Sequence, residues 1–247
     1  ISIIDLDADR FVGEVETPGC ASIYPAGPRD FYSICGDGGF LHLRLDEQGA
    51  VVLKQRSQPL FDPLKDLFTT SASRIGGTWY FVSRENHAYA VQMTPDELKV
   101  ARRWSLVSDA ERAADWRISG VHHTAVHAET GRLFVLMHQG GPETFQEPGT
   151  EVWVYDVQTG EKRQTLELKE LSLSIGVSPG AQPRLYSVDY VMPMPFLATA
   201  WIFATEGKDG VVRRLQQQVN LYDADSGEHL RTVDGLPYGY LNMVLPW

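Results

Sequence analysis

The sequence predicts an all-β fold of the β-propeller class, on three observations. First, apolar residues alternate at period two in short runs that Gly, Pro, Asp or Asn interrupt, while helical periodicity is scarce. Second, a strand–turn–strand phrase with an aspartate at its turn recurs along the chain. Third, a phrase of strand, polar turn and aromatic-rich strand precedes it. Together the two phrases make four strands per repeat, the number in a propeller blade.

The aspartate phrase places Asp5, Asp156 and Asp223 at the end of an alternating strand. Its copies read ISIIDLDADR at 1–10, VWVYDVQTGEKRQTL at 152–166 and VNLYDADSGEHLRTV at 219–233. Weaker copies are LHLRLDEQGAVVL at 41–53 and AYAVQMTPDELKV at 88–100. Because a catalytic acid is expected once and not in every repeat, we interpret these aspartates as turn formers.

The second phrase completes the blades. It reads SIYPAGPRDFYSIC at 22–35, TSASRIGGTWYFVS at 70–83, TAVHAETGRLFVLMH at 124–138 and SIGVSPGAQPRLYSVD at 174–189. Pairing the phrases predicts four blades, at about 20–62, 68–105, 121–166 and 171–235. Residues 1–19 then form the outer hairpin of one further blade and 236–247 the opening strand of another. We therefore expect one propeller domain over 1–247, with four full and two partial blades, that is incomplete by two to three blades on its N-terminal side.

Composition narrows the classes of partner. The 247 residues are 43% hydrophobic and 22% charged, enough to bury a large core. Lys and Arg number 22 against 32 Asp and Glu, a net charge of −10, which repels nucleic acid and anionic membrane surfaces. The longest apolar stretch, 191–204, carries two prolines and falls short of the ~20 residues of a membrane-spanning helix. Neither nucleic acid nor a membrane is an expected partner.

Three connections interrupt the repeats. Ser108 to Glu111 fits a capping box, which predicts a short helix over Asp109 to Trp116. Gln139 to Thr150 is a Gly- and Pro-rich loop inside a hairpin. Residues 190–213 form a longer insertion. Its apolar bulk, at Phe196, Trp201 and Phe203, either faces a partner or packs on its own propeller.

The only cysteines, Cys20 and Cys35, end the two arms of one predicted hairpin. Residues that face each other across paired strands lie at a separation that suits a disulfide. The alternative is a pair of buried free thiols, as in a cytosolic protein. A bridge would indicate an oxidising compartment. Neither cysteine belongs to a set of four close zinc ligands.

Catalytic motifs are absent from the sequence. It contains no G-x-S-x-G, Walker, H-E-x-x-H or Rossmann motif, and Gly36 to Gly39 is interpreted as a hairpin turn. Four histidines fall in one predicted blade, and two of them would share a strand face: His122, His123, His127 and His138. Two ligands do not make a site, so hydrogen-bonded structural histidines are expected. We assign no catalytic, cofactor-binding or metal-binding residue to this chain.

Three segments carry a resemblance to a known family. They are CASIYP…FYSICGDGGFLHLRLDEQG at 20–49, WSLVSDAERAADWRISG at 104–120 and GRLFVLMHQGG…EVWVYDVQTGEK at 131–162. They resemble the heavy subunit of the tryptophan tryptophylquinone amine dehydrogenases, the family of aromatic amine dehydrogenase and methylamine dehydrogenase. The similarity covers most of 1–189 and resumes at Val219.

The resemblance implies a seven-bladed propeller in the bacterial periplasm, with Cys20 and Cys35 joined as the family's disulfide. It implies oxidative deamination of a primary amine to aldehyde and ammonia, at a tryptophan tryptophylquinone carried by a separate small subunit. Two heavy and two light chains would form a heterotetramer, with a blue copper protein or a cytochrome as electron acceptor. The insertion at 190–213 is longer than the family pattern. The alternative is therefore a non-catalytic propeller scaffold that binds another protein.

Overall fold

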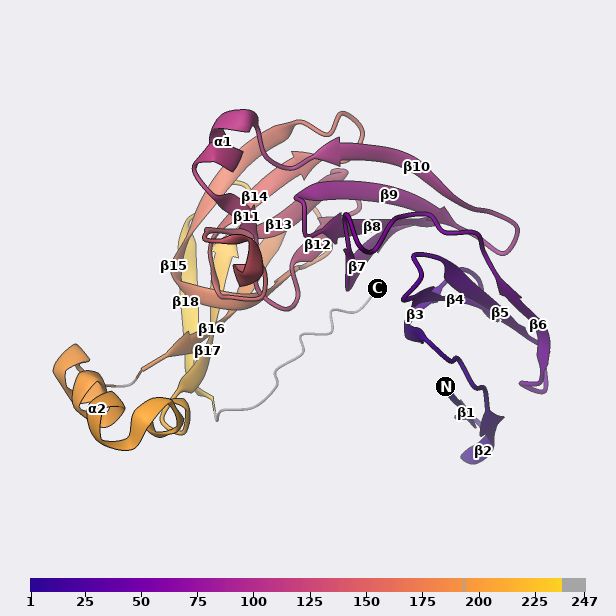
Figure 1. The fold of residues 1–247 in the computed structure, drawn as a ribbon, viewed down its shortest axis with the longest axis horizontal. Helices are drawn as coiled ribbons and strands as arrows, with labels where there is room; N and C mark the ends of the chain where they lie inside the picture. Colours follow the sequence, from indigo (N-terminus) through magenta and orange to yellow (C-terminus); the bar gives the residue numbers. More distant parts are fainter. Residues whose placement is uncertain (193, 237–247) are drawn as a thin grey trace. The chain divides into compact units, whose positions relative to one another are not determined.

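Antiparallel strands make up most of the regular structure in the computed structural model, which describes residues 1–192 and 194–236 (Figure 1). The chain divides into two compact units. Unit 1 comprises residues 1–70 and 76–104, and unit 2 comprises 71–75 and the chain from 105 onward. Within the described ranges, no helix is long and apolar enough to cross a membrane. The expected single domain over 1–247 stays a prediction.

The first ten strands form a hairpin and two four-stranded sheets. In chain order they are β1 (Ser2–Asp5), β2 (Arg10–Glu14), β3 (Cys20–Pro25), β4 (Asp30–Cys35), β5 (Phe40–Leu45), β6 (Val51–Arg56), β7 (Phe68–Ile75), β8 (Thr78–Ser83), β9 (His87–Met93) and β10 (Leu98–Ser105). Strands β1 and β2 pair with each other, and β3 to β6 and β7 to β10 pair in sequence order. These two sheets match the four-stranded units that the sequence predicts at 20–62 and 68–105.

The remaining strands form one continuous sheet. They are β11 (Trp116–Ile118), β12 (Thr124–His127), β13 (Arg132–Gln139), β14 (Gly149–Asp156), β15 (Lys162–Val177), β16 (Arg184–Val191), β17 (Gln216–Asp223) and β18 (His229–Leu236). Both β11 and β12 pair with β13, and β13 to β18 follow in chain order. The helices are α1 (Asp109–Ala113), the 3-10 helix η1 (Pro142–Thr144) and α2 (Phe196–Val212).

The predicted boundary between the third and fourth blades, between residues 166 and 171, is wrong. Strand β15 runs through it. It is one strand of 16 residues, and its first half pairs with β14 while its second half pairs with β16. The pairing with β14 is irregular between Gly149 and Glu151, where the register shifts. A strand can bend at such an irregularity without ending. The two predicted repeats therefore share a strand, and no turn separates them.

Aspartate turns close the hairpins, as predicted. In each, one carboxylate oxygen accepts hydrogen bonds from backbone N–H groups two to four residues ahead, as in an Asx turn. The bonds are Asp5 with Ala8 (3.1 Å), Asp46 with Gln48 (2.9 Å) and Ala50 (2.8 Å), Asp156 with Gln158 and Thr159 (both 2.8 Å), and Asp223 with Asp225 and Ser226 (both 3.0 Å). Backbone donors lower the pKa of Asp5, Asp156 and Asp223.

The predicted capping box forms at α1. The Ser108 side chain accepts from the Glu111 N–H, and Glu111 Oε2 accepts from the Ser108 N–H at 2.7 Å. The predicted end of the helix at Trp116 is wrong, because α1 stops at Ala113 and Asp115 has a positive φ of 60°. Trp116 instead begins β11.

An aromatic cluster fills unit 1. Phe81 is fully buried at its centre, and its ring centroid lies 5.1 Å from Tyr24, 5.8 Å from Phe40 and 5.4 Å from Phe68. Tyr24 and Phe40 come from β3 and β5, whereas Phe68 and Phe81 come from β7 and β8. The Tyr24 hydroxyl donates to the carbonyl of Thr70 at 2.9 Å. Burial between these two sheets thus joins them face to face.

In unit 2 the core is largely aliphatic. Residues from both halves of the continuous sheet form one cluster: Ala125, Phe134, Leu136, Val152, Val154, Leu166, Ile175, Val177, Leu185, Tyr222 and Ala224. Strand β12 also meets the second half of β15, where His122 and Ser174 form a parallel bridge. The bend in β15 therefore lets two parts of one sheet pack on each other.

Replacing Phe81 with alanine should lower the free energy of unfolding by about 3–5 kcal/mol, because the change leaves a cavity among rings that cannot collapse into it. Urea denaturation measures the loss. Phe11→Ala is the matched control, since Phe11 is 60% exposed, and its effect should stay within about 0.5 kcal/mol. Equal effects of the two changes would contradict a core role for Phe81.

Candidate functional site

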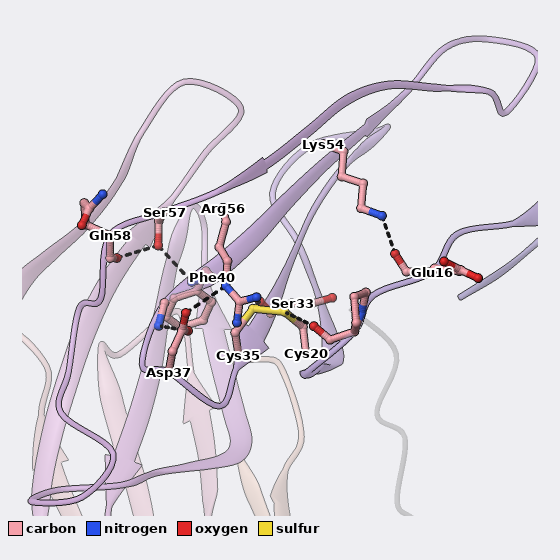
Figure 2. Close-up of a disulfide and its surroundings, with 12 residues drawn as sticks. Glu16, Cys20, Ser33, Cys35, Asp37, Phe40, Lys54, Arg56, Ser57 and Gln58 are labelled. Atoms are coloured by element: carbon pink, nitrogen blue, oxygen red, sulfur yellow. Dashed lines mark hydrogen bonds and ion pairs between the residues drawn. A yellow bond between two sulfur atoms is a disulfide. The ribbon is translucent and has the colours of Figure 1, made fainter.

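A disulfide joins Cys20 and Cys35 (Figure 2). Cys20 begins β3, Cys35 ends β4, and the two residues pair directly in the register of these strands. The alternative of two free thiols is therefore wrong. Cys35 packs with Val15, Leu41 and Leu43 in a small core to which the β1–β2 hairpin also contributes. The bridge thus lies where the hairpin and the β3–β6 sheet meet.

The turn after Cys35 is tightly built. Asp37 Oδ1 accepts from the Gly39 N–H at 3.0 Å, and Asp37 Oδ2 pairs with Arg56 Nε at 3.0 Å (Figure 2). Gly38 has a φ of 86°, and a Cβ atom there would lie 2.0 Å from the carbonyl oxygen of Phe61. Only glycine fits at this point. The segment Gly36 to Gly39 is the predicted hairpin turn, because β4 and β5 pair on either side of it.

Three of the four histidines have separate structural partners. His123 Nδ1 lies 2.7 Å from the Ser119 carbonyl oxygen, His127 bonds to Thr130 Oγ1 and the Gly180 carbonyl oxygen, and His138 Nε2 lies 3.0 Å from Thr144 Oγ1. Burial lowers the pKa of His123 to about 4, so its ring is neutral at pH 7. The expectation of hydrogen-bonded structural histidines is confirmed for these three. Across 1–192 and 194–236, no three His, Cys, Asp or Glu side chains gather to hold a metal ion.

A polar cluster around Asp66 in unit 1 is not predicted by the sequence. Asp66 Oδ2 accepts from the Tyr89 hydroxyl at 2.8 Å and lies 2.9 Å from His87 Nδ1. Arg103 Nη2 lies 3.1 Å from His87 Nε2 and 3.2 Å from His87 Nδ1, and 3.6 Å from Asp66 Oδ2. Both ring nitrogens of His87 are thus engaged, so the cluster ties the connection before β7 to β9 and β10. Its members are 16 to 23 residues from their partners, and only the sheet topology brings them together.

A second buried polar cluster lies between the strands of unit 2. Asp189 on β16 is fully buried, and its Oδ2 accepts from Ser187 Oγ at 3.0 Å and from the Asn220 side-chain amide. Asn220 Oδ1 in turn accepts from Thr232 Oγ1 and lies 2.8 Å from His229 Nε2. Asp189 Oδ1 has no hydrogen-bond partner within the described structure. Burial raises the pKa of Asp189 to about 6, although the bonds from Asn220 and Ser187 favour the charged form.

The residues proposed to face a partner all lie on α2. Phe196, Trp201 and Phe203 expose between 60% and 81% of their surface, and the neighbouring Leu197 exposes 80%. Helix α2 leaves the sheet after β16 and projects beyond the ends of β16 and β17 (Figure 1). The sequence indicates an apolar insertion here but predicts no helix within it. The exposure of these side chains is what a partner-binding surface needs, and the binding itself stays a prediction.

The sequence matches the protein family described as methylamine dehydrogenase heavy chain over residues 1–217. The chain belongs to this heavy-chain family. It is 26% identical over 242 residues to the methylamine dehydrogenase heavy chain of Paracoccus versutus, an alignment that covers 97% of this chain and 50% of that protein. The heavy chain of Methylorubrum extorquens is 26% identical over 189 residues, which cover 76% of this chain and 46% of the relative.

The chain thus spans about half the length of the curated heavy chains it matches. Among solved structures, the Neurospora crassa Pan2 WD40 domain matches with a TM-score of 0.55 at 9% identity, over 94% of this chain and 59% of that one. Kuenenia stuttgartiensis hydrazine synthase matches with a TM-score of 0.51 at 10% identity, over 90% and 51%. At such identities the likeness concerns the fold alone. It confirms the predicted all-β propeller class, while the number of blades stays a prediction.

Reducing the disulfide should lower the free energy of unfolding by about 3 kcal/mol, because Cys20 and Cys35 are 15 positions apart in the sequence and the bridge limits the conformations of the unfolded chain. Denaturant titrations with and without dithiothreitol measure the change. The double variant Cys20→Ala/Cys35→Ala is the control and should not respond to reductant. An unchanged midpoint on reduction would contradict a stabilising role of the bridge.

The raised pKa of Asp189 predicts a stability that falls as pH rises. The unfolded carboxyl has a pKa near 3.9, so the folded state binds more protons between about pH 4 and 6. Relative to Asp189→Asn, the wild type should lose up to about 3 kcal/mol between pH 4 and 7. Unfolding titrations across this range measure the difference, and parallel curves for the two proteins would refute the prediction.

Asp156→Asn is the control of opposite sign. Asp156 lies in an exposed turn, where backbone N–H donors, that of Thr159 first, lower its pKa. Its charge therefore stabilises the fold above the ordinary carboxyl pKa, and that contribution is lost as pH falls. The wild type and Asp156→Asn should consequently diverge at neutral pH and converge in acid.

Proposed function

We propose that this chain is part of the heavy subunit of a periplasmic quinoprotein amine dehydrogenase. The assembled enzyme would oxidise a primary amine to an aldehyde and ammonia. The observation that carries the proposal is the match to the heavy-chain family over 1–217, which includes all of unit 1 and most of unit 2. The alignment with the Paracoccus versutus heavy chain, over 97% of this chain, supports it.

The proposal gives this chain a structural role in the enzyme. A tryptophan tryptophylquinone on a smaller subunit would supply the two-electron oxidation of the amine, and we assign none of the catalytic groups to the present chain. Two heavy and two light chains would form the assembly, with a blue copper protein or a cytochrome as electron acceptor. The contribution of this chain is a surface that holds the smaller subunit in place.

The disulfide supports a periplasmic location. Disulfides persist in oxidising compartments such as the bacterial periplasm and are rare in the cytosol. Cys20 and Cys35 are the only cysteines of the chain and both are in the bridge, so no free thiol competes for pairing. The net charge of −10 is compatible with a protein that avoids anionic surfaces.

Co-purification tests the proposal. The complete heavy chain, affinity-tagged and isolated from its source organism, should bring with it a smaller, cysteine-rich subunit with quinone absorbance. The complex should reduce an artificial electron acceptor when a primary amine is added. The separated heavy chain, as control, should lack both the absorbance and the activity. A homogeneous preparation that oxidises amines without a smaller subunit would refute the proposal.

The non-catalytic scaffold is the second candidate, and the exposed α2 is the observation that favours it. A scaffold should bind a protein through α2 and show no amine oxidation in any preparation. Deleting α2 would then abolish its complex. If instead the purified assembly oxidises amines, the scaffold hypothesis is wrong.

A further inference from the structure

We propose that Arg117 and His138 form a binding site for a small carboxylate anion at one end of the unit 2 sheet. The two residues lie directly opposite each other in the register of β11 and β13. Both are largely buried, since the Arg117 side chain is 12% exposed and His138 is 5% exposed. This site goes beyond the proposed function, which assigns no bound molecule to this chain.

Arg117 lacks a counter-ion that matches its burial. Its Nε is buried and has no hydrogen-bond partner among the described residues. Its ion pair within the described structure joins Nη2 to Asp115 Oδ1 over 3.8 Å, which is too long for a hydrogen bond. The Asp115 side chain is 71% exposed, so solvent weakens this pair further. A buried guanidinium needs both a paired charge and bonded N–H groups, and Arg117 is therefore short of an acceptor.

Ser119 offers a second donor beside Arg117. It continues the pairing of β11 with β13, because its N–H donates to the Leu136 carbonyl at 3.0 Å. Residues two apart on a strand point to the same face, so Ser119 and Arg117 share one. Ser119 is fully buried, and its hydroxyl has no hydrogen-bond partner among the described residues. A hydroxyl and a guanidinium N–H can both donate, so two donors on one strand face lack an acceptor.

His138 faces Arg117 as a neutral ring. The Thr144 hydroxyl donates to the Gly141 carbonyl at 2.8 Å, so its oxygen accepts from His138 Nε2 at 3.0 Å. Burial lowers the pKa of His138. The Glu147 carboxylate opposes this shift, and the Arg117 charge adds to it. An anion beside Arg117 would offset that positive charge, so its binding should be accompanied by proton uptake at His138.

The surrounding charges select the class of anion. The planar edge of an arginine matches the two oxygens of a carboxylate, which can accept from Nε and Nη2 together. Asp115 and Glu147 place two negative charges nearby, so a dianion such as phosphate is repelled more strongly than a monoanion. Because Nε is buried, a small carboxylate that displaces Asp115 fits better than an extended partner surface.

Titration of the complete heavy chain with sodium acetate, at constant ionic strength in sodium chloride, tests the inference. Calorimetry and the NMR signal of the His138 ring should both report saturable binding, tighter at about pH 6 than at about pH 8. Arg117→Gln should weaken it about tenfold or more, because a charged hydrogen-bond donor is lost. The matched control is Arg132→Gln. Arg132 is a similarly buried arginine on β13 whose guanidinium pairs with Asp225 at 2.8 Å, and its loss should leave acetate binding unchanged.

Circular dichroism and the unfolding midpoint establish that each variant folds. If Arg117→Gln does not fold, Asp115→Asn tests the same contact, since it removes the competing carboxylate and should tighten acetate binding severalfold. Unchanged affinity in that variant would overturn the inference.

Three further outcomes would also overturn it. Equal binding by wild type and folded Arg117→Gln would indicate an adventitious ion only. A complete heavy chain that binds no acetate would show that Arg117 needs no ligand, as when another part of the heavy chain pairs with it. Tighter binding of phosphate than of acetate would refute the carboxylate assignment. None of these measurements involves the smaller subunit, so their failure leaves the proposed function standing.

Discussion

An antiparallel sheet has two faces, and each unit buries sheet faces internally: in unit 1 the β3–β6 sheet packs on the β7–β10 sheet, and in unit 2 two parts of one continuous sheet pack on each other. This burial is the interaction on which the rest of the structure depends. Phe81 and its neighbours supply it in unit 1, while the cluster around Leu136 and Leu185 supplies it in unit 2. Apolar burial is the dominant favourable term in folding. Turns, caps and the disulfide then select which strand pairing provides that burial.

The features that the sequence predicts correctly are local ones. Period-two alternation and the aspartate turns identify the strands and hairpins, because each signal lies within about ten residues. The capping box at Ser108 is equally local. The boundary inside β15 failed because Leu166 and Leu168 continue the alternation of a strand into the next repeat, and only pairing with two different neighbours shows where it bends. The Asp66 and Asp189 clusters were missed because their members meet only through the sheet register.

The buried polar groups differ in what they do for the fold. Asp66 accepts several hydrogen bonds and joins a connection to a sheet at little cost. Asp189 is fully buried with one oxygen unpartnered, which opposes its ionisation. Burying such a group costs free energy unless every lone pair is satisfied, so the cluster around Asn220 contributes less stability than an apolar replacement of the same shape would. The cluster instead specifies how the strands pair, because Asn220 can bond Asp189, His229 and Thr232 together only when β16, β17 and β18 are in register.

Helix α2 is an exception to this burial of apolar side chains, because the described structure places almost none of its own apolar side chains in a core. The sequence could indicate apolar bulk between 190 and 213, but not its exposure, since both a packed and an unpacked insertion would be rich in Phe and Trp. The exposure of these side chains depends on where α2 lies, which is at the ends of β16 and β17, the strands that precede and follow it. Helix α2 projects beyond the ends of β16 and β17 (Figure 1), and it makes no extensive contact with the other helices and strands of unit 2. Apolar side chains exposed in this way cost free energy until another surface covers them.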